Sequence, residues 1–202
     1  TTDDFFMALD PSLYDYRFLE ALPEREAKME GYLFPATYDI SPEATPREIV
    51  DMMLKTFDEN FTDTYYARAK ELGRSVDEII TLASIVERET NADTERAKVA
   101  GVFYNRLEIN MPLESCATVQ YVLGENKPVL SVEDTHIDSP YNTYRNYGLP
   151  IGPISSPGAD CIKAVLYPED TDAFFFVLGA DGEHIFSKTY EEHVQAMEEN
   201  GL

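Results

Sequence analysis

Three capping boxes give the chain helices with defined starting points. Each has a serine or threonine at the first position and a glutamate three residues later, at 45–48, 75–78 and 189–192. The first also has Pro46 at the first helical position, where proline is favoured. Apolar residues then recur at helical spacing as far as Phe57. The fold is therefore expected to be built mainly from helices.

Periodicity and turn residues predict the remaining elements. They are a short helix, an extended aromatic segment and three further helices, at residues 12–22, 30–40, 94–107, 118–123 and 159–166. A buried strand is predicted at 173–178, followed by a hairpin turn at Asp181-Gly182 and a returning strand at 184–187. The class is therefore α+β, a helical centre with a small antiparallel β-sheet.

The composition indicates a single folded domain with a strongly acidic surface. Hydrophobic residues make up 44% of the 202 residues, enough for a sizeable core. The net charge of −22 repels phosphate groups, so neither nucleic acid nor anionic lipid is expected as a partner. The longest apolar stretch, 173–178, is much shorter than the roughly 20 residues of a membrane-spanning helix.

Cysteine and histidine give no sign of a metal or redox centre. Cys116 and Cys161 lack C-x-x-C spacing, and the sequence allows either one disulfide or two free thiols. The three histidines are scattered, so no metal is expected. The chain also lacks nucleotide-binding, dinucleotide-binding and serine-hydrolase motifs, and no cofactor is expected.

The helix predicted from residue 76 to about 90 is the strongest candidate for chemistry. Its isoleucines, leucine and valine define a broad buried face, and Glu87 and Glu89 fall on opposite flanks of it. A carboxyl group beside an apolar wall loses hydration, which raises its pKa and suits a general acid. Both glutamates are equally compatible with solvated positions paired to Arg88 or Arg96. Periodicity does not choose between them.

A long loop at 138–158 interleaves aromatic residues with proline and glycine, which is typical of ordered functional loops. Its segment 141–144, Tyr-Asn-Thr-Tyr, offers an amide and two phenols close together. With Tyr32 and Tyr38 it is suited to line a sugar-binding groove. The alternative is that these aromatics are ordinary core residues, an interpretation we favour for Phe34 but not for Asn142.

Six segments resemble successive blocks of the MltG (YceG-like) family of endolytic murein transglycosylases, in family order. They are EGYLFPATYDI, LASIVERET, ERAKVAGVFYNRL, MPLESCATVQYVLG, DSPYNTYRNYGLPIGPISSPG and FFFVLGADGEHIFSKTYEEH. Together they run from Glu30 to His193 and cover most of the chain.

This resemblance implies that residues 1–202 form a catalytic domain with a lysozyme-like helical centre. The family's N-terminal transmembrane helix and LysM-like lobe lie outside this chain, so any membrane anchor is expected upstream. The full-length protein is then expected at the extracytoplasmic face of the bacterial membrane, beside cell-wall synthases. Its substrate is expected to be the glycan strand of peptidoglycan.

The resemblance also assigns residues. It implies Glu89 as the catalytic acid and base for a cut between N-acetylmuramic acid and N-acetylglucosamine that leaves a 1,6-anhydro end, with no second carboxylate required. The residues expected to bind substrate are Tyr141, Asn142, Thr143, Tyr144, Gln120, Asn105, Glu30 and Tyr32. Two alternatives stay open: a weakly catalytic glycan-binding or scaffold module, and a hydrolase that pairs Glu89 with Glu87, Glu95 or Glu30.

Overall fold

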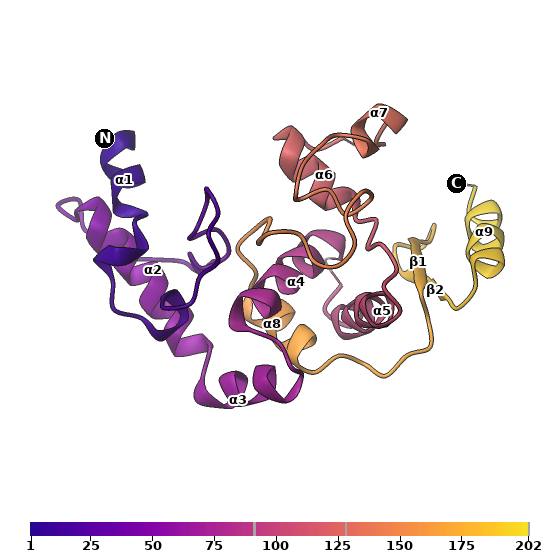
Figure 1. Ribbon diagram of the computed structural model, residues 1–202, viewed down its shortest axis with the longest axis horizontal. Coiled ribbons are helices and arrows are strands. Elements are labelled where there is room, and N and C mark those ends of the chain that lie inside the picture. Colours follow the sequence, from indigo (N-terminus) through magenta and orange to yellow (C-terminus); the bar gives the residue numbers. More distant parts are fainter. Residues whose placement is uncertain (91, 128, 202) are drawn as a thin grey trace.

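The computed structural model describes residues 1–90, 92–127 and 129–201 (Figure 1). It is mostly helical, with one two-stranded antiparallel sheet. The α-helices are α1 (Thr2–Ala8), α2 (Pro46–Asn60), α3 (Asp63–Glu71), α4 (Val76–Glu89), α5 (Arg96–Glu108), α6 (Cys116–Leu123), α7 (Val132–Thr135), α8 (Ala159–Leu166) and α9 (Tyr190–Glu199). The α+β class expected from the sequence is confirmed.

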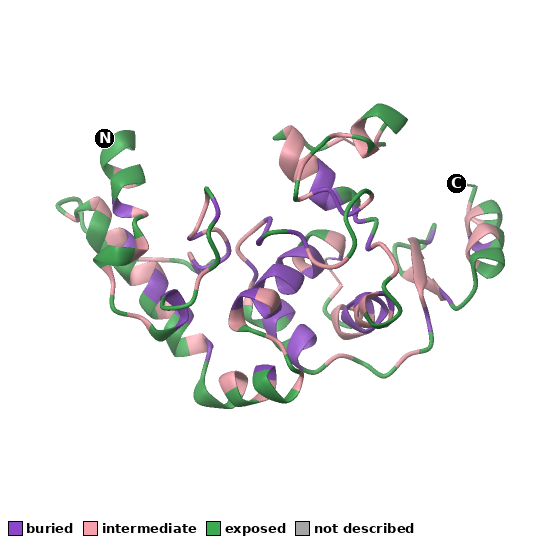
Figure 2. Cartoon of the chain, viewed as in Figure 1, coloured by how far each residue is buried: buried purple, intermediate pink, exposed green. Residues whose placement is uncertain are grey.

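Helix α4 lies at the centre and packs against α5 and α8 (Figure 1). It begins at Ser75, whose hydroxyl accepts from the backbone N–H of Glu78 while the Glu78 carboxylate accepts from the N–H of Ser75. All residues from Ile79 to Val86 are buried, so the helix is enclosed on most sides (Figure 2). Its C-terminal residue, Glu89, stands where the helix leaves this enclosed core.

The N-terminal part differs from the expectation. Instead of one helix over 12–22, it forms two short 3₁₀ turns, η1 (Pro11–Leu13) and η2 (Arg17–Leu19), with extended backbone between them. The Tyr16 hydroxyl donates to the Asp51 carboxylate on α2 at 2.9 Å, and the Tyr14 hydroxyl donates to the carbonyl of Ala8 at 2.7 Å. These longer-range contacts stabilise the extended segment over a continuous helix. Helices α1, α3 and α7 were not predicted.

The hairpin near the C-terminus has the predicted turn, but its first strand is less buried than predicted. Strand β1 (Phe175–Leu178) pairs with β2 (His184–Ser187), so that Phe176 lies opposite Phe186. The prediction that 173–178 forms a buried strand was wrong in its burial, because β1 is half-buried to exposed. Helix α9 packs against both strands and α5 against β1, but this two-stranded sheet is not enclosed as a central strand of a larger sheet would be.

The loop at 138–158 crosses α4 and is fixed to it at Ser84. The Ser84 hydroxyl accepts from the N–H of Ile154 at 2.9 Å, and the Ser155 hydroxyl donates to the Ser84 carbonyl at 3.0 Å. Gly31 contacts this loop with a φ of +91°, and a Cβ there would lie 2.7 Å from Pro153. Glycine is required there by both the backbone angle and the close approach. These contacts hold the loop against α4.

Within the described residues, none of the helices combines the length and the apolar character needed to cross a lipid bilayer.

Candidate active site

Glu89 lies at the last position of α4, where the start of α6 covers it. The hydroxyl of Ser115 donates to Oε1 of Glu89. Ser115 is itself buried, while Glu89 is half-buried. The carboxyl group therefore has one neutral donor, on a residue that keeps some exposed surface.

The burial of Glu89 favours its protonated form. Burial raises the pKa of Glu89, although the Ser115 hydroxyl and the more distant charges of His184 and Arg106 oppose the shift. Within the described part of the chain, neither lysine, arginine nor histidine forms an ion pair with this carboxylate. A carboxyl in this setting holds a proton to higher pH than an ordinary glutamic acid, as a general acid requires.

Ser115 is held by two buried threonines. The N–H of Ser115 donates to the hydroxyl of Thr143 at 3.0 Å, and the hydroxyl of Thr118 donates to the carbonyl of Ser115 at 2.7 Å. The two threonine hydroxyls are 2.9 Å apart. Thr143 was expected to bind substrate, but its buried side chain instead fixes the residue that contacts Glu89.

Tyr144 and Cys116 lie beside this group. The Tyr144 hydroxyl is 3.0 Å from the Cys116 sulfur. Burial raises the pKa of Tyr144, and the Cys116 thiol and the carboxylates of Glu114 and Glu89 raise it further. Tyr144 is therefore a neutral phenol close enough to Glu89 for that carboxylate to affect its pKa. Its role in substrate binding stays a prediction. Cys116 and Cys161 are both free thiols, which settles the alternative that the sequence left open.

A second carboxylate, Glu95, has its oxygens engaged. Its Oε1 accepts from the N–H of His184 at 2.7 Å, and its Oε2 lies 2.6 Å from His184 Nδ1 and 3.2 Å from the Thr90 hydroxyl. Burial opposes ionisation of Glu95, but the hydrogen bonds from His184 outweigh it and lower the pKa. This group anchors the β-hairpin to the segment that follows α4.

The structure gives Glu87 a different environment from Glu89. Its Oε2 accepts from the N–H of Gly158 at 2.9 Å, at the residue that caps α8. A carboxylate at a helix N-terminus interacts favourably with the exposed N–H groups and the helix dipole. The two flanks of α4 thus face different partners, α8 for Glu87 and α6 for Glu89.

Asn142 was expected to bind substrate, but its side chain forms hydrogen bonds within the fold. The Asn142 side-chain amide donates to the carbonyls of Thr135 and Ile137, and its oxygen accepts from the N–H of Tyr144. With no exposed surface, Asn142 shapes the loop, and its position does not support direct contact with a ligand.

Tyr32, Asn105 and Gln120 are also engaged within the fold. Tyr32 has no exposed surface, and its hydroxyl donates to the Asp77 carboxylate at 2.8 Å. Asn105 donates to two carbonyls in the segment before β1, and Gln120 donates to the carbonyl of Lys127. Phe34 is a core residue, as expected.

Glu30 and Tyr141 are half-buried, and burial together with the Glu30 charge raises the pKa of Tyr141. The Tyr141 ring packs against Tyr121 with centroids 4.8 Å apart. Burial raises the pKa of Glu30, and the Arg25 charge opposes the shift. These two side chains keep exposed surface from which to contact a ligand.

Sequence reasoning missed Ser115, Arg106 and His184 as neighbours of Glu89. The buried Arg106 donates to the carbonyls of Leu113 and Phe174, so it holds both the segment before α6 and the start of β1. A buried arginine gives no signal in the sequence, because arginine is normally exposed. Within the described residues, His, Cys, Asp and Glu form no group of three or more that could hold a metal ion.

Comparison with known proteins identifies the family of the chain. The sequence profile of the YceG-like family matches residues 4–199. An endolytic murein transglycosylase of Bacillus subtilis is 42% identical over 171 residues, which are 84% of this chain and 47% of that protein. One of Streptococcus pneumoniae is 38% identical over 185 residues, which are 87% of this chain and 33% of that protein. The chain therefore spans half or less of the length of these relatives.

The chain is also similar to a protein whose structure has been solved. The crystal structure of a YceG-like protein from Listeria monocytogenes has a TM-score of 0.78 and 41% sequence identity, and the match covers 83% of this chain and 55% of that one. The family profile covers nearly the whole chain, and the structural match covers most of it. The chain belongs to the YceG-like family.

Proposed function

We propose that the chain is the catalytic domain of a lytic transglycosylase that cuts peptidoglycan glycan strands within their length. The observation that carries the proposal is the half-buried carboxyl of Glu89, which has a raised pKa, a neutral hydrogen-bond donor and no ion pair with any residue that the structure describes. Family membership supports the substrate class, since similar proteins are named endolytic murein transglycosylases.

In the proposed reaction, protonated Glu89 donates its proton to the oxygen between N-acetylmuramic acid and N-acetylglucosamine. The bond from that oxygen to C1 breaks, and the C6 hydroxyl of the same muramic acid attacks C1. The Glu89 carboxylate then takes the proton from this hydroxyl. The products are a free N-acetylglucosamine end and a 1,6-anhydro-N-acetylmuramic acid end, with no net consumption of water.

Ser115 is assigned a positioning role in this reaction. Its hydroxyl stabilises the carboxylate form of Glu89 and fixes the orientation of that group. Tyr144 supplies a neutral phenol next to the reacting carboxyl and is assigned to substrate binding. Tyr141 and Glu30 are assigned to the same groove on the strength of their exposed surface.

The competing hydrolytic mechanism requires a second carboxylate to activate a water molecule. Two of the three carboxylates considered have other contacts: Glu95 accepts from His184 and Thr90, and Glu87 accepts from the N–H of Gly158 at the start of α8. These contacts favour the one-carboxylate reaction over a pairing of Glu89 with Glu95 or Glu87. Localisation at the extracytoplasmic face, and work beside cell-wall synthases, are proposed from family membership alone.

The test is an analysis of products. Purified peptidoglycan strands are incubated with the wild type, with Glu89→Gln and with Glu87→Gln, and the new ends are identified by mass spectrometry. We expect anhydro ends from the wild type and from Glu87→Gln, and none from Glu89→Gln. Glu87→Gln is a matched control, because it makes the same chemical change on the opposite flank of one helix.

Two results would overturn the proposal. Reducing ends without the anhydro ring would identify a hydrolase. Absence of cleavage by the wild type, with retained binding to the strands, would identify a glycan-binding module.

A further inference from the structure

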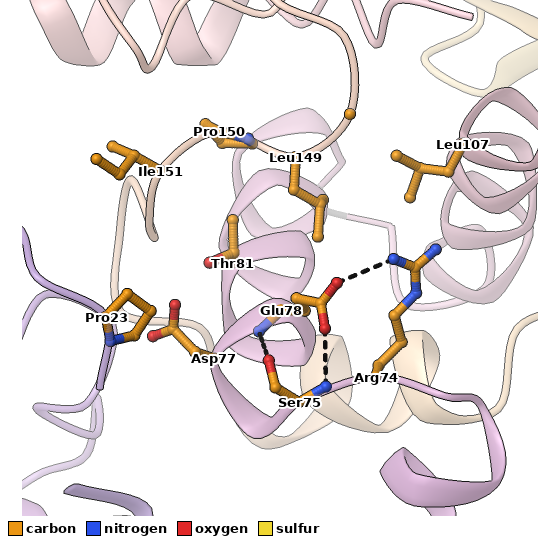
Figure 3. A pocket seen from close by; sticks show the side chains of 11 residues that line it. Pro23, Arg74, Ser75, Asp77, Glu78, Thr81, Leu107, Leu149, Pro150 and Ile151 are labelled. Carbon is orange, nitrogen blue, oxygen red and sulfur yellow. Dashed lines mark hydrogen bonds and ion pairs between the residues drawn. The ribbon is translucent and has the colours of Figure 1, made fainter. Parts of the chain in front are cut away.

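The larger of two described cavities lies at the opposite end of α4 from Glu89. It has a volume of about 460 Å³, which falls in the usual range of ligand sites. One wall is apolar, from Leu107 and the loop residues Leu149, Pro150 and Ile151. The other wall is polar and comes from the first turns of α4. Figure 3 shows Arg74, Ser75 and Glu78 at the foot of that helix, with the loop above them.

Among the polar groups of this wall, Arg74 is the one with unused hydrogen-bonding capacity and a positive charge. Asp77 is fully engaged by Arg25 and Tyr32, and Glu78 binds the N–H of Ser75. Among the described residues, the Arg74 guanidinium makes one hydrogen bond, from one terminal nitrogen to Glu78 at 3.0 Å, and the side chain is 29% exposed. Its other N–H groups have no partner among the described residues. Arginine in this state suits a carboxylate, which it can bind through two nitrogens.

The position of the cavity relative to Glu89 gives a length for the ligand. Glu78 and Glu89 are three helical turns apart, or about 16 Å along α4, and within about 20° of each other around its axis. One loop borders both places, since Tyr144 lies beside Cys116 at the start of α6 and 148–151 line the cavity. A fully extended peptide of five residues spans about 17 Å.

The chemistry of the lining favours a peptide over a sugar. Sugar-binding sites commonly use an aromatic ring against the face of the sugar, and among the described lining residues none is aromatic. Small aliphatic side chains next to a carboxylate would match an apolar wall beside a guanidinium. Peptidoglycan carries such groups in the short peptides on its muramic acid residues.

We propose that this cavity binds the stem peptide of the strand whose glycosidic bond lies at Glu89, with Arg74 contacting a peptide carboxylate. The inference rests on the proposed function and adds to it a source of selectivity. Strands that retain their peptides are bound at two places, and strands that have lost them at one.

Binding is measured first, because it does not depend on catalysis. The probe is the peptide L-Ala-γ-D-Glu-L-Lys-D-Ala-D-Ala, titrated into the full chain and followed by NMR shifts and calorimetry. We expect shifts at 74–81 and 148–151, and about tenfold weaker binding by Arg74→Ala, the effect of one charge-assisted hydrogen bond. Lys55→Ala is the control, since it removes a cation from a comparable pair four residues apart on α2. Equal binding by both variants, or shifts elsewhere, would overturn the inference.

Cleavage then separates the two proposals. Arg74→Ala is expected to raise KM for peptide-bearing strands about tenfold with kcat unchanged, and to leave strands stripped of peptides by an amidase unaffected. An equal loss on both kinds of strand would show a purely structural role and overturn the inference. Absence of cleavage by the wild type would contradict the proposed function, while Arg74-dependent peptide binding would still support the cavity.

Discussion

Helix α4 carries a buried or half-buried carboxyl group near each end, and the two are satisfied in opposite ways. At the N-terminal end, Asp77 accepts two hydrogen bonds from Arg25, at 2.7 and 2.8 Å, and one from Tyr32 at 2.8 Å. At the C-terminal end, Glu89 accepts from the neutral hydroxyl of Ser115 and has no ion pair within the described part of the chain.

The difference separates a structural carboxylate from a chemical one. A buried carboxylate with a matched guanidinium is stable as an anion and holds its elements together. A carboxyl with only a neutral donor is poorly stabilised as an anion, so it exchanges its proton more readily near the pH of use. We therefore expect substitutions at the two ends to fail in different measurements.

The largest expected effect is on catalysis by Glu89→Gln. Loss of the titrating proton should lower the rate of strand cleavage about a thousandfold, the usual contribution of a general acid and base. Thermal unfolding should change little, because glutamine keeps the shape and can still accept from Ser115. A variant that cleaves at a similar rate, or one that unfolds, would place Glu89 in the same structural class as Asp77.

The next effect is on stability at the other end of the helix. Asp77→Ala should lower the free energy of unfolding by about 3 kcal/mol or more, because it leaves Arg25 buried without its partner. Urea unfolding measures the change. Asp63→Ala, which breaks the exposed pair with Arg17, should leave the urea midpoint almost unchanged. Equal midpoints for the two variants would mean that the buried pair does not stabilise the fold.

Ser115→Ala tests the difference between Glu89 and Asp77 through the pH dependence of activity. The hydroxyl donates to the carboxylate form of Glu89 and lowers its pKa, so its removal should raise that pKa further. Because the acid must be protonated to start the reaction, the alkaline limb of the activity profile should move to higher pH. The maximal rate should fall about tenfold as the carboxyl loses its orientation. A lower rate with an unmoved limb would show that Ser115 only supports the fold.

Thr143→Val tests the hydrogen bond that holds the backbone of Ser115 in place, and it should have the smallest effect. It removes the acceptor of the Ser115 N–H, which should lower the free energy of unfolding by about 1–2 kcal/mol. The alkaline limb of the pH–activity profile should move in the same direction as in Ser115→Ala, but by less. Thr143→Ser keeps the hydroxyl, so a serine variant as unstable as the valine one would contradict the hydrogen-bonding role.

The sequence predicts helices well where the signal is local. The capping boxes at Ser75 and Thr189 give the starts of α4 and α9, because side chain and backbone contacts are completed within one turn. Residues 12–22 fail for the opposite reason. Their extended conformation depends on a hydrogen bond from Tyr16 to Asp51 on α2, a residue that lies 35 positions further along the chain.

Prediction of the candidate site from the sequence is limited for the same reason, because its contacts are not local. Helical periodicity places Glu87 and Glu89 on opposite flanks of α4 and leaves the choice open, because it does not reveal that α8 covers one flank and Ser115 the other. Asn142 carries the polar groups of a binding residue, yet the loop uses all of them internally. The residue types indicate chemistry, but the neighbours that assign it come from distant parts of the chain.

The central claim is that Glu89 titrates above the ordinary range of a glutamic acid, and the direct measurement is its carboxyl pKa. The side-chain carboxyl carbons of isotope-labelled glutamates are followed by NMR against pH, and the Glu89 signal is assigned by its absence in Glu89→Gln. The account predicts a raised pKa in the wild type and a still higher one in Ser115→Ala. A pKa at or below the ordinary value would contradict it and return Glu89 to the class of structural carboxylates.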